Sequence, residues 1–404
     1  MKKSPLATIL LVVFVDLIGF GMIIPILPLY AKSFQAQEWQ IGLLFGCYSF
    51  MQFVASPVLG SISDRIGRKP VLLVSLIGSA AGYVVMANAQ SLTMLFIARI
   101  IAGVCGASVG TASAYIADIT PPENRSRRMG LIGAAFGVGF VLGPAIGGIL
   151  SHFWTVGPFW FGAGLAVLNA IAVLLVLPEP EQHVKRVGAA VPGSPDAVER
   201  TGFDGIAVLI VTYFVAIAGF AIVTMIYPQV LDRRFNLTPT QISLVFVFLG
   251  VVGALIQGGA IGRMAKRFGD YKLAGAGLIL MAISMLSMPF AQNMQLFLVF
   301  TFGLAVGQSL AQPTLMAMAS RLAASTAQGR VIGTVQSAGS LGRVVGPSAG
   351  GFMLGWDRPG PALAYGNTPF LIGGIVMGIA FLLSLMLRRS SVSVAETPVE
   401  VARK

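Results

Sequence analysis

The chain has 404 residues, of which 56% are hydrophobic and only 10% are charged. A soluble domain carries about 25% charged residues, so this composition excludes an ordinary soluble protein and indicates one that lies in a bilayer. The net charge of +12 does not indicate nucleic-acid binding, because the bases lie in short loops and form no dense patch with interleaved aromatic residues.

Twelve apolar segments follow one another along the chain, each near the length of about 20 residues that a membrane-spanning helix needs. They lie near 6–30, 40–62, 70–89, 92–118, 127–151 and 158–178, then near 204–230, 239–265, 271–290, 293–322, 328–355 and 367–388. We predict an all-α membrane protein of twelve transmembrane helices in two six-helix halves, 1–178 and 204–390. A polar linker, 179–203, joins them, and 391–404 forms a polar tail.

The positions of the basic residues predict that both termini are cytoplasmic, because Lys and Arg are retained in cytoplasmic loops. With this orientation nearly all Lys and Arg residues of the loops fall on the cytoplasmic side. Two arginines lie within helices, Arg99 and Arg343. The opposite side holds only Lys32, Arg233, Arg234 and Arg358.

Several chemistries are not expected. Cys47 and Cys105 lie inside apolar segments and are predicted to be packing residues rather than a disulfide or a metal site. No P-loop of the GxxxxGK[ST] type occurs, so ATP hydrolysis by that machinery is excluded. We expect no enzyme, no metal and no cofactor.

The segment 60–70, GSISDRIGRKP, connects the second and third spans and concentrates charge at a membrane face. Gly60 would let another backbone approach closely, Gly67 permits a tight turn, and Pro70 suits the first turn of a helix. One acid among three bases predicts a charged latch rather than a simple basic loop. Its residues are Gly60, Asp64, Arg65, Gly67, Arg68 and Lys69.

Two motifs recur half a chain length later, which indicates an internal duplication and pseudo-symmetric halves. The segment 262–272, GRMAKRFGDYK, has the glycine spacing of 60–70, and Gly346-Pro347 repeats Gly143-Pro144. The prolines would kink their helices, and Gly139, Gly143 and Gly147 would admit a close neighbour. Helices 5 and 8, and 11 and 2, are expected to form the seams between halves. The bends would allow rocking, or serve tight packing alone.

These motifs resemble the major facilitator superfamily. The segment 60–70 resembles its signature between helices 2 and 3, and 139–148, GFVLGPAIGG, resembles the helix-5 signature of its proton-coupled antiporters. The segment 16–28, DLIGFGMIIPILP, resembles helix 1 of the drug:proton antiporter group with twelve helices. From about residue 10 to 150 the chain is most similar to tetracycline efflux proteins, which implies a bacterial inner membrane location.

The resemblance also implies partners for the latch. Arg68 would pair with Asp118 at the cytoplasmic end of helix 4, and Asp64 would lie by the N-terminus of helix 11, where the helix dipole favours negative charge. Together these contacts would hold the halves closed on the cytoplasmic side. The alternative is that the charges only set the topology.

Asp16 is the only acid predicted near mid-depth. An ionised carboxylate there costs several kcal/mol, so burial favours the neutral acid and makes proton uptake feasible. We interpret Asp16 as a proton-coupling residue, in agreement with the helix-1 acid of the resembling antiporters. The alternative is a structural Asp bonded to hydroxyls or waters.

Arg99 and Arg343 cannot neutralise, so each must pair or face water. Arg99 and Gly103 resemble the family's helix-4 arginine signature, which implies a part in proton transfer, although Ala102 replaces the usual glutamine. A structural counter-ion is the alternative. Arg343 would attract an anionic group or tie a bent helix. Uncharged polar residues would line the substrate cavity beside it: Gln52, Asn169, Tyr227, Gln257, Gln308, Gln312 and Gln336.

We predict a monomeric secondary transporter that exports small amphipathic molecules in exchange for protons, by alternating access about a mid-membrane site. Gly82 stands where tetracycline exporters carry an acid in helix 3, and their helix-9 acid and helix-8 His are absent. Metal-bound tetracycline is therefore not the expected substrate. The alternatives are an exporter of a sugar, metabolite or lipid, an uncoupled uniporter, or a receptor that moves no substrate.

Overall fold

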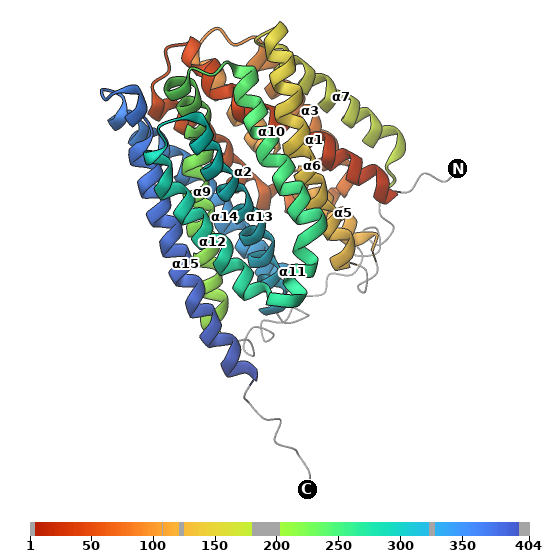
Figure 1. Cartoon of the computed structure of the whole chain (residues 1–404). Coiled ribbons are helices and arrows are strands. Elements are labelled where there is room, and N and C mark those ends of the chain that lie inside the picture. The colour runs from red at the N-terminus through yellow and green to blue at the C-terminus, as the bar shows by residue number, and fades with distance from the viewer. Residues whose placement is uncertain (1–4, 107, 121–124, 180–202, 323–327, 396–404) are drawn as a thin grey trace.

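The computed structural model describes residues 5–106, 108–120, 125–179, 203–322 and 328–395. All elements in these ranges are helices (Figure 1). The first half contains α1 (Pro5–Ser33), α2 (Glu38–Ile66), α3 (Arg68–Ala87), α4 (Leu92–Cys105), α5 (Ser108–Asp118), α6 (Arg125–Phe153) and α7 (Gly157–Val176). The second half contains α9 (Phe203–Phe235), α10 (Pro239–Leu255), α11 (Ile261–Phe268), α12 (Asp270–Ser287), α13 (Met294–Leu322), α14 (Gln328–Asp357) and α15 (Asn367–Ala395).

The predicted all-α class is confirmed, and every predicted span coincides with helix. The fourth span is shared by α4 and α5, and the eighth by α10, a π-helical turn at Ile256–Ala260 and α11. Ten described helices are long and apolar enough to cross a membrane, and Val141–Phe153 of α6 is a shorter apolar stretch. The helix α14 is not among the ten. It packs between α2 and α9, and its glycines from Gly339 to Gly351 are buried against these helices.

The chain's end differs from the prediction. The helix α15 runs to Ala395, past the predicted start of the tail at 391. Apolar sequence marks where lipid contact ends, but a helix satisfies its own backbone groups and can continue into water. The linker from 180 to 202 and the tail from 396 to 404 lie outside the described residues.

The two halves repeat the same packing (Figure 1). In the first half α1 packs along α6 and α3 against α7, and in the second α9 packs along α14 and α12 against α15. Because these pairs occupy equivalent places in the two halves, they agree with the internal duplication found in the motifs.

The seams between the halves are those predicted, α2 with α14 and α6 with α10. A Cβ at Gly351 would lie 3.1 Å from the Cα of Gly42, and Thr240 donates a hydrogen bond of 3.2 Å to the carbonyl of Gly148. The motif glycines Gly139 and Gly143 instead face α1 inside the first half. Small residues therefore tighten both the seams and the packing within each half.

The halves are tied at one end of the bundle, which we call the Glu38 end. Lys32 of α1 forms an ion pair of 3.0 Å with Asp232 of α9. Glu38 accepts hydrogen bonds from the Tyr365 hydroxyl at 3.2 Å and from Arg358 at 3.5 Å, both in the second half. These contacts close the Glu38 end.

The four bases predicted for the non-cytoplasmic side all lie at the Glu38 end, and each has a polar partner. Lys32 and Arg358 make the ion pairs just described. Arg233 donates to the Arg358 carbonyl at 2.6 Å, and Arg234 donates to the Tyr365 carbonyl at 2.6 Å. Each of these bases therefore holds this end together. This contact role accounts for their place on the side where the rule of cytoplasmic Lys and Arg predicts few bases.

At the other end, the Arg68 end, the chain turns at Gly67 and Gly269. A side chain added at Gly60, Gly258 or Gly262 would meet no atom of the described residues within 4 Å. The close backbone approach predicted for Gly60 is therefore not made in this conformation. Described contacts therefore tie the two halves together at the Glu38 end, whereas Gly60, Gly258 and Gly262 face open space at the Arg68 end.

Candidate functional site

Asp16 lies in the middle of α1 and borders an internal cavity rather than lipid. The Ser108 hydroxyl, at the start of α5, donates a hydrogen bond of 2.7 Å to its Oδ2. Tyr48 of α2, Tyr83 of α3 and Arg99 of α4 line the same cavity. Asp16 is thus the one carboxyl among the residues that line this cavity, and all of these residues belong to the first half.

Arg99 is 1% exposed and is held without a carboxylate partner in the part of the chain that the structure describes. Its guanidinium carbon lies 4.2 Å from the ring centre of Tyr48 and 5.5 Å from that of Phe45. Such cation–π contacts stabilise a desolvated cation. Its Nε donates to the Leu44 carbonyl at 3.3 Å, but Nη1 has no hydrogen-bond acceptor among the described residues.

Tyr83 reaches the cavity through a slot between two glycines. A Cβ at Gly19 of α1 would lie 2.5 Å from the Tyr83 hydroxyl oxygen, and one at Gly162 of α7 would lie 3.0 Å from its ring. Sequence reasoning did not assign Tyr48, Tyr83 or Ser108 to the site. Their signal was a polar side chain within an apolar span, the same signal that selected the glutamines.

A second polar cluster lies in the other half. Gln308 donates a hydrogen bond of 2.7 Å to Gln312, one turn along α13, and Arg343 of α14 donates to Ser340 at 2.9 Å. Tyr213 of α9, which sequence reasoning missed, lies beside Arg343, because a Cβ at Gly339 would contact both side chains. The structure thus brings three predicted cavity residues together.

Other predicted cavity residues lie apart from this cluster. Asn169 is 4% exposed and donates to the Val12 carbonyl at 2.8 Å, and Tyr227 is 2% exposed and bonded to Thr301. Both tie helices together within one half, which differs from the predicted lining role and reflects how seldom a buried polar group goes unbonded. Gln52 bonds the Gly106 carbonyl at 2.6 Å, where α4 gives way to α5. Gln257 and Gln336 are exposed, the former in the π-helical turn.

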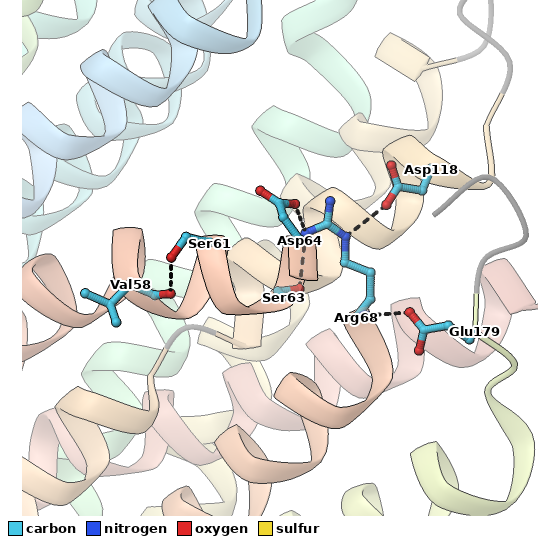
Figure 2. Close-up of polar contacts among 7 residues, drawn as sticks. All are labelled: Val58, Ser61, Ser63, Asp64, Arg68, Asp118 and Glu179. Carbon is cyan, nitrogen blue, oxygen red and sulfur yellow. Dashed lines mark hydrogen bonds and ion pairs between the residues drawn. The ribbon is translucent and has the colours of Figure 1, made fainter. Parts of the chain in front are cut away.

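The latch is built around Arg68 (Figure 2). Its Nε donates to Asp118 at 2.9 Å, which confirms the predicted pair, and its Nη1 contacts Asp64 at 2.6 Å. Arg68 and Asp118 are buried, whereas the Asp64 side chain is 65% exposed. The predicted contact of Asp64 with helix 11 (α14) is not among the described interactions, in which Asp64 pairs with Arg68.

The turn before α3 is one residue long. Gly67 alone separates α2 from α3 and has a φ of 111°, a left-handed conformation that favours glycine, as predicted. Glu179, which sequence reasoning missed, accepts hydrogen bonds from the backbone N–H groups of Arg68 at 2.5 Å and Lys69 at 3.0 Å. An acid at a helix N-terminus satisfies free donors and the helix dipole, so the first residue of the predicted linker anchors α3.

The second half carries the same pair with its signs reversed. Asp270 begins α12, as Arg68 begins α3, and Arg321 lies in the last turn of α13. The two form an ion pair of 3.0 Å, with Asp270 buried and the Arg321 side chain 74% exposed. The duplication therefore kept the contact and exchanged its charges.

A duplicated helical bundle with a polar interior and seams between two halves defines a multi-pass membrane transporter. A family model of the Major Facilitator Superfamily matches residues 9–202 and 209–404. The chain belongs to this superfamily.

Curated relatives are drug-resistance proteins. The chain is 33% identical over 351 residues to the class C tetracycline resistance protein of Escherichia coli, covering 86% of this chain and 88% of the relative. It is 28% identical over 393 residues to multidrug resistance protein 1 of Bacillus subtilis (strain 168), covering 95% and 96%.

Solved structures share the fold. The human organic anion transporter MFSD10 (TETRAN) has a TM-score of 0.71 at 24% identity and covers 95% of this chain and 100% of its own. A bacterial homolog of the human lysosomal transporter Spinster, in an inward-facing and occupied conformation, has a TM-score of 0.81 at 15% identity, with coverages of 97% and 98%.

The Tyr83 slot gives a matched test. Gly19→Ala should drive a methyl group into the Tyr83 hydroxyl, and overpacking of this kind costs about 1–3 kcal/mol. Gly164→Ala, at a glycine of α7 with open space around it, is the control. We expect a lower melting temperature of purified protein for Gly19→Ala only. Equal melting temperatures for the two variants would show that Tyr83 is not confined by this slot.

Proposed function

We propose that the protein exports small amphipathic, drug-like molecules in exchange for protons by alternating access. The observation that carries the proposal is the placement of Asp16, a carboxyl on the wall of an internal cavity with one hydroxyl donor, Ser108. Such a group exchanges a proton only when the cavity opens to water, so its occupancy can follow the opening of the two ends. The drug-resistance relatives support the substrate class.

In this mechanism Asp16 takes up a proton when the Glu38 end is open and releases it when the Arg68 end is open. With the proposed cytoplasmic termini, the Arg68 end faces the cytoplasm, and the conformation open at that end would release protons and load substrate. The latch closes the Arg68 end in the other conformation, when Asp64 can reach α14. The transporter uses the proton gradient as its energy source and needs no cofactor.

The test is Asp16→Asn in proteoliposomes with an imposed pH gradient. We expect this variant to lose gradient-driven efflux of amphipathic dyes and drugs while its abundance in the membrane stays unchanged, because asparagine keeps the shape but cannot carry the proton. Ser108→Ala is the matched control, since it removes the hydrogen bond of 2.7 Å and leaves the carboxyl in place. Transport by Asp16→Asn that still follows the pH gradient would refute proton coupling through this residue.

A further inference from the structure

The turn between α11 and α12 is more basic than the turn it repeats, between α2 and α3. Three exposed bases precede it: Arg263, Lys266 and Arg267. The equivalent positions of the repeated motif in the first half are exposed as well, and they hold Ser61, Asp64 and Arg65. An exposed face without net charge in one half is thus a face with three positive charges in the other.

The three bases lie on one side of α11, because residues three and four positions apart are neighbours on a helix. The opposite side is apolar: Ile261, Met264, Ala265 and Phe268. The first three of these are half-buried, and Phe268 is 47% exposed. The helix continues the apolar span Pro239–Phe268 at the Arg68 end of the bundle (Figure 1). Its bases therefore stand where an apolar span meets the membrane surface.

No acid in the described part of the chain neutralises this basic face. None of the three bases takes part in a described ion pair. Arg267 instead lies over the ring of Phe268, with its guanidinium carbon 5.4 Å from the ring centre. The nearest acid along the chain, Asp270, is 6% exposed and is already paired with Arg321 at 3.0 Å. The Arg321 side chain is 74% exposed, so it adds a further exposed base.

The rule that Lys and Arg gather on the cytoplasmic side does not by itself account for this face. Both turns lie at the same end of the bundle, so topology sets the same demand on each. Only the second, however, has a base, Lys266, where the first has the exposed Asp64. A partner that binds the second half alone accounts for the difference.

The partner that fits is a phosphate group at the membrane surface. Arginine and lysine donate charge-assisted hydrogen bonds to phosphate oxygens, and basic residues beside a membrane span attract anionic lipids. Phe268, exposed beside Arg267, offers apolar contact to the part of the lipid below its headgroup.

We propose that α11 binds the headgroup of an anionic phospholipid through Arg263, Lys266 and Arg267, and that the first half has no such site. The site lies outside the cavity that Asp16 lines, so it does not depend on the transported molecule.

The test is a titration of the full-length protein in detergent with phosphatidylglycerol or phosphatidylcholine, followed by native mass spectrometry. We expect wild-type protein to bind phosphatidylglycerol about 10- to 100-fold more tightly, as several charges near a membrane surface would give. The triple variant Arg263→Gln, Lys266→Gln, Arg267→Gln should lose this preference. Its melting temperature without lipid should match wild type, because all three side chains are exposed. Arg65→Gln, at the equivalent of Arg267, is the control and should keep the preference.

A gain of binding tests the charge pattern directly. Ser61→Arg combined with Asp64→Lys gives the first half the same three charges, and this double variant should bind a second phosphatidylglycerol. A double variant without a second bound lipid would show that these three charges do not make the site.

Two further results would overturn the lipid site outright. One is equal binding of the two lipids by wild type, or a preference that survives in the triple variant. The other is displacement of the lipid by soluble glycerol phosphate at equal concentration, because the face would then hold a free phosphate and not a lipid.

Discussion

Reversing Arg68 to aspartate should destabilise the protein severely, and the further change Asp118→Arg should restore much of the loss. Arg68 and Asp118 are buried and 2.9 Å apart, so the single variant places a second carboxylate against Asp118 where the guanidinium stood. Loss of one partner of a buried pair costs about 3–5 kcal/mol. The reversed pair should fit, because Asp270 and Arg321 already occupy the equivalent places in the second half in that order.

The measurement is the melting temperature and membrane yield of the two variants beside wild type. Asp64→Asn is the control: its side chain is 65% exposed, and exposed pairs contribute about 0–1 kcal/mol. A double variant no more stable than Arg68→Asp would show that the surroundings of Arg68 and Asp118 do not accept the charge order found at Asp270 and Arg321.

Removing the Glu38 carboxylate should open the Glu38 end. Glu38 is 7% exposed and joins α2 to both Arg358 and Tyr365 across the two halves. Truncating one partner of such a buried, hydrogen-bonded contact costs about 2–5 kcal/mol, and that cost falls on the conformation in which the contact is made. Glu38→Ala should therefore shift the population by a factor of at least about 10 toward the conformation open at this end.

The shift is measurable by double electron–electron resonance between spin labels at Ser91, before α4, and Asn293, before α13. The background variant has Cys47 and Cys105 changed to serine. The label distance should lengthen in Glu38→Ala. Asp232→Asn is the matched control, because the Lys32–Asp232 side chains are 29% and 40% exposed and their pair is weaker. An unchanged distance distribution in Glu38→Ala would show that glycine packing at the seam, not this contact, holds the end closed.

Much of this architecture can be predicted from the sequence because membrane-spanning helices have strong local sequence patterns. Apolar length gives the spans, and the repeated glycine and proline motifs give the duplication, the seams and the turn at Gly67. The Arg68–Asp118 pair was predictable from family resemblance, since both residues belong to motifs at one membrane face.

The remaining contacts depend on how helices cross, which no local pattern encodes. Glu38 meets Tyr365 only because α2 and the connection before α15 converge, and Glu179 reaches α3 from the end of α7. The predicted place of Asp64 by helix 11 belongs to a conformation closed at the Arg68 end, and the described ion pair of Asp64 is with Arg68 instead. Arg99 was selected as a charge inside the membrane, but the bond of its Nε to the Leu44 carbonyl, and the lack of an acceptor for Nη1 among the described residues, depend on how the helices pack.

The single-glycine corner between α2 and α3, repeated by Gly269 between α11 and α12, has a mechanical consequence. A connection of one residue cannot lengthen or bend freely, so a tilt of α2 at its seam with α14 must move α3 as well. The first half should therefore rotate as a rigid body. A flexible insert that lengthens either corner would leave the helices intact, but it would uncouple their tilts. A movement at one end of the bundle would then no longer produce a movement at the other end.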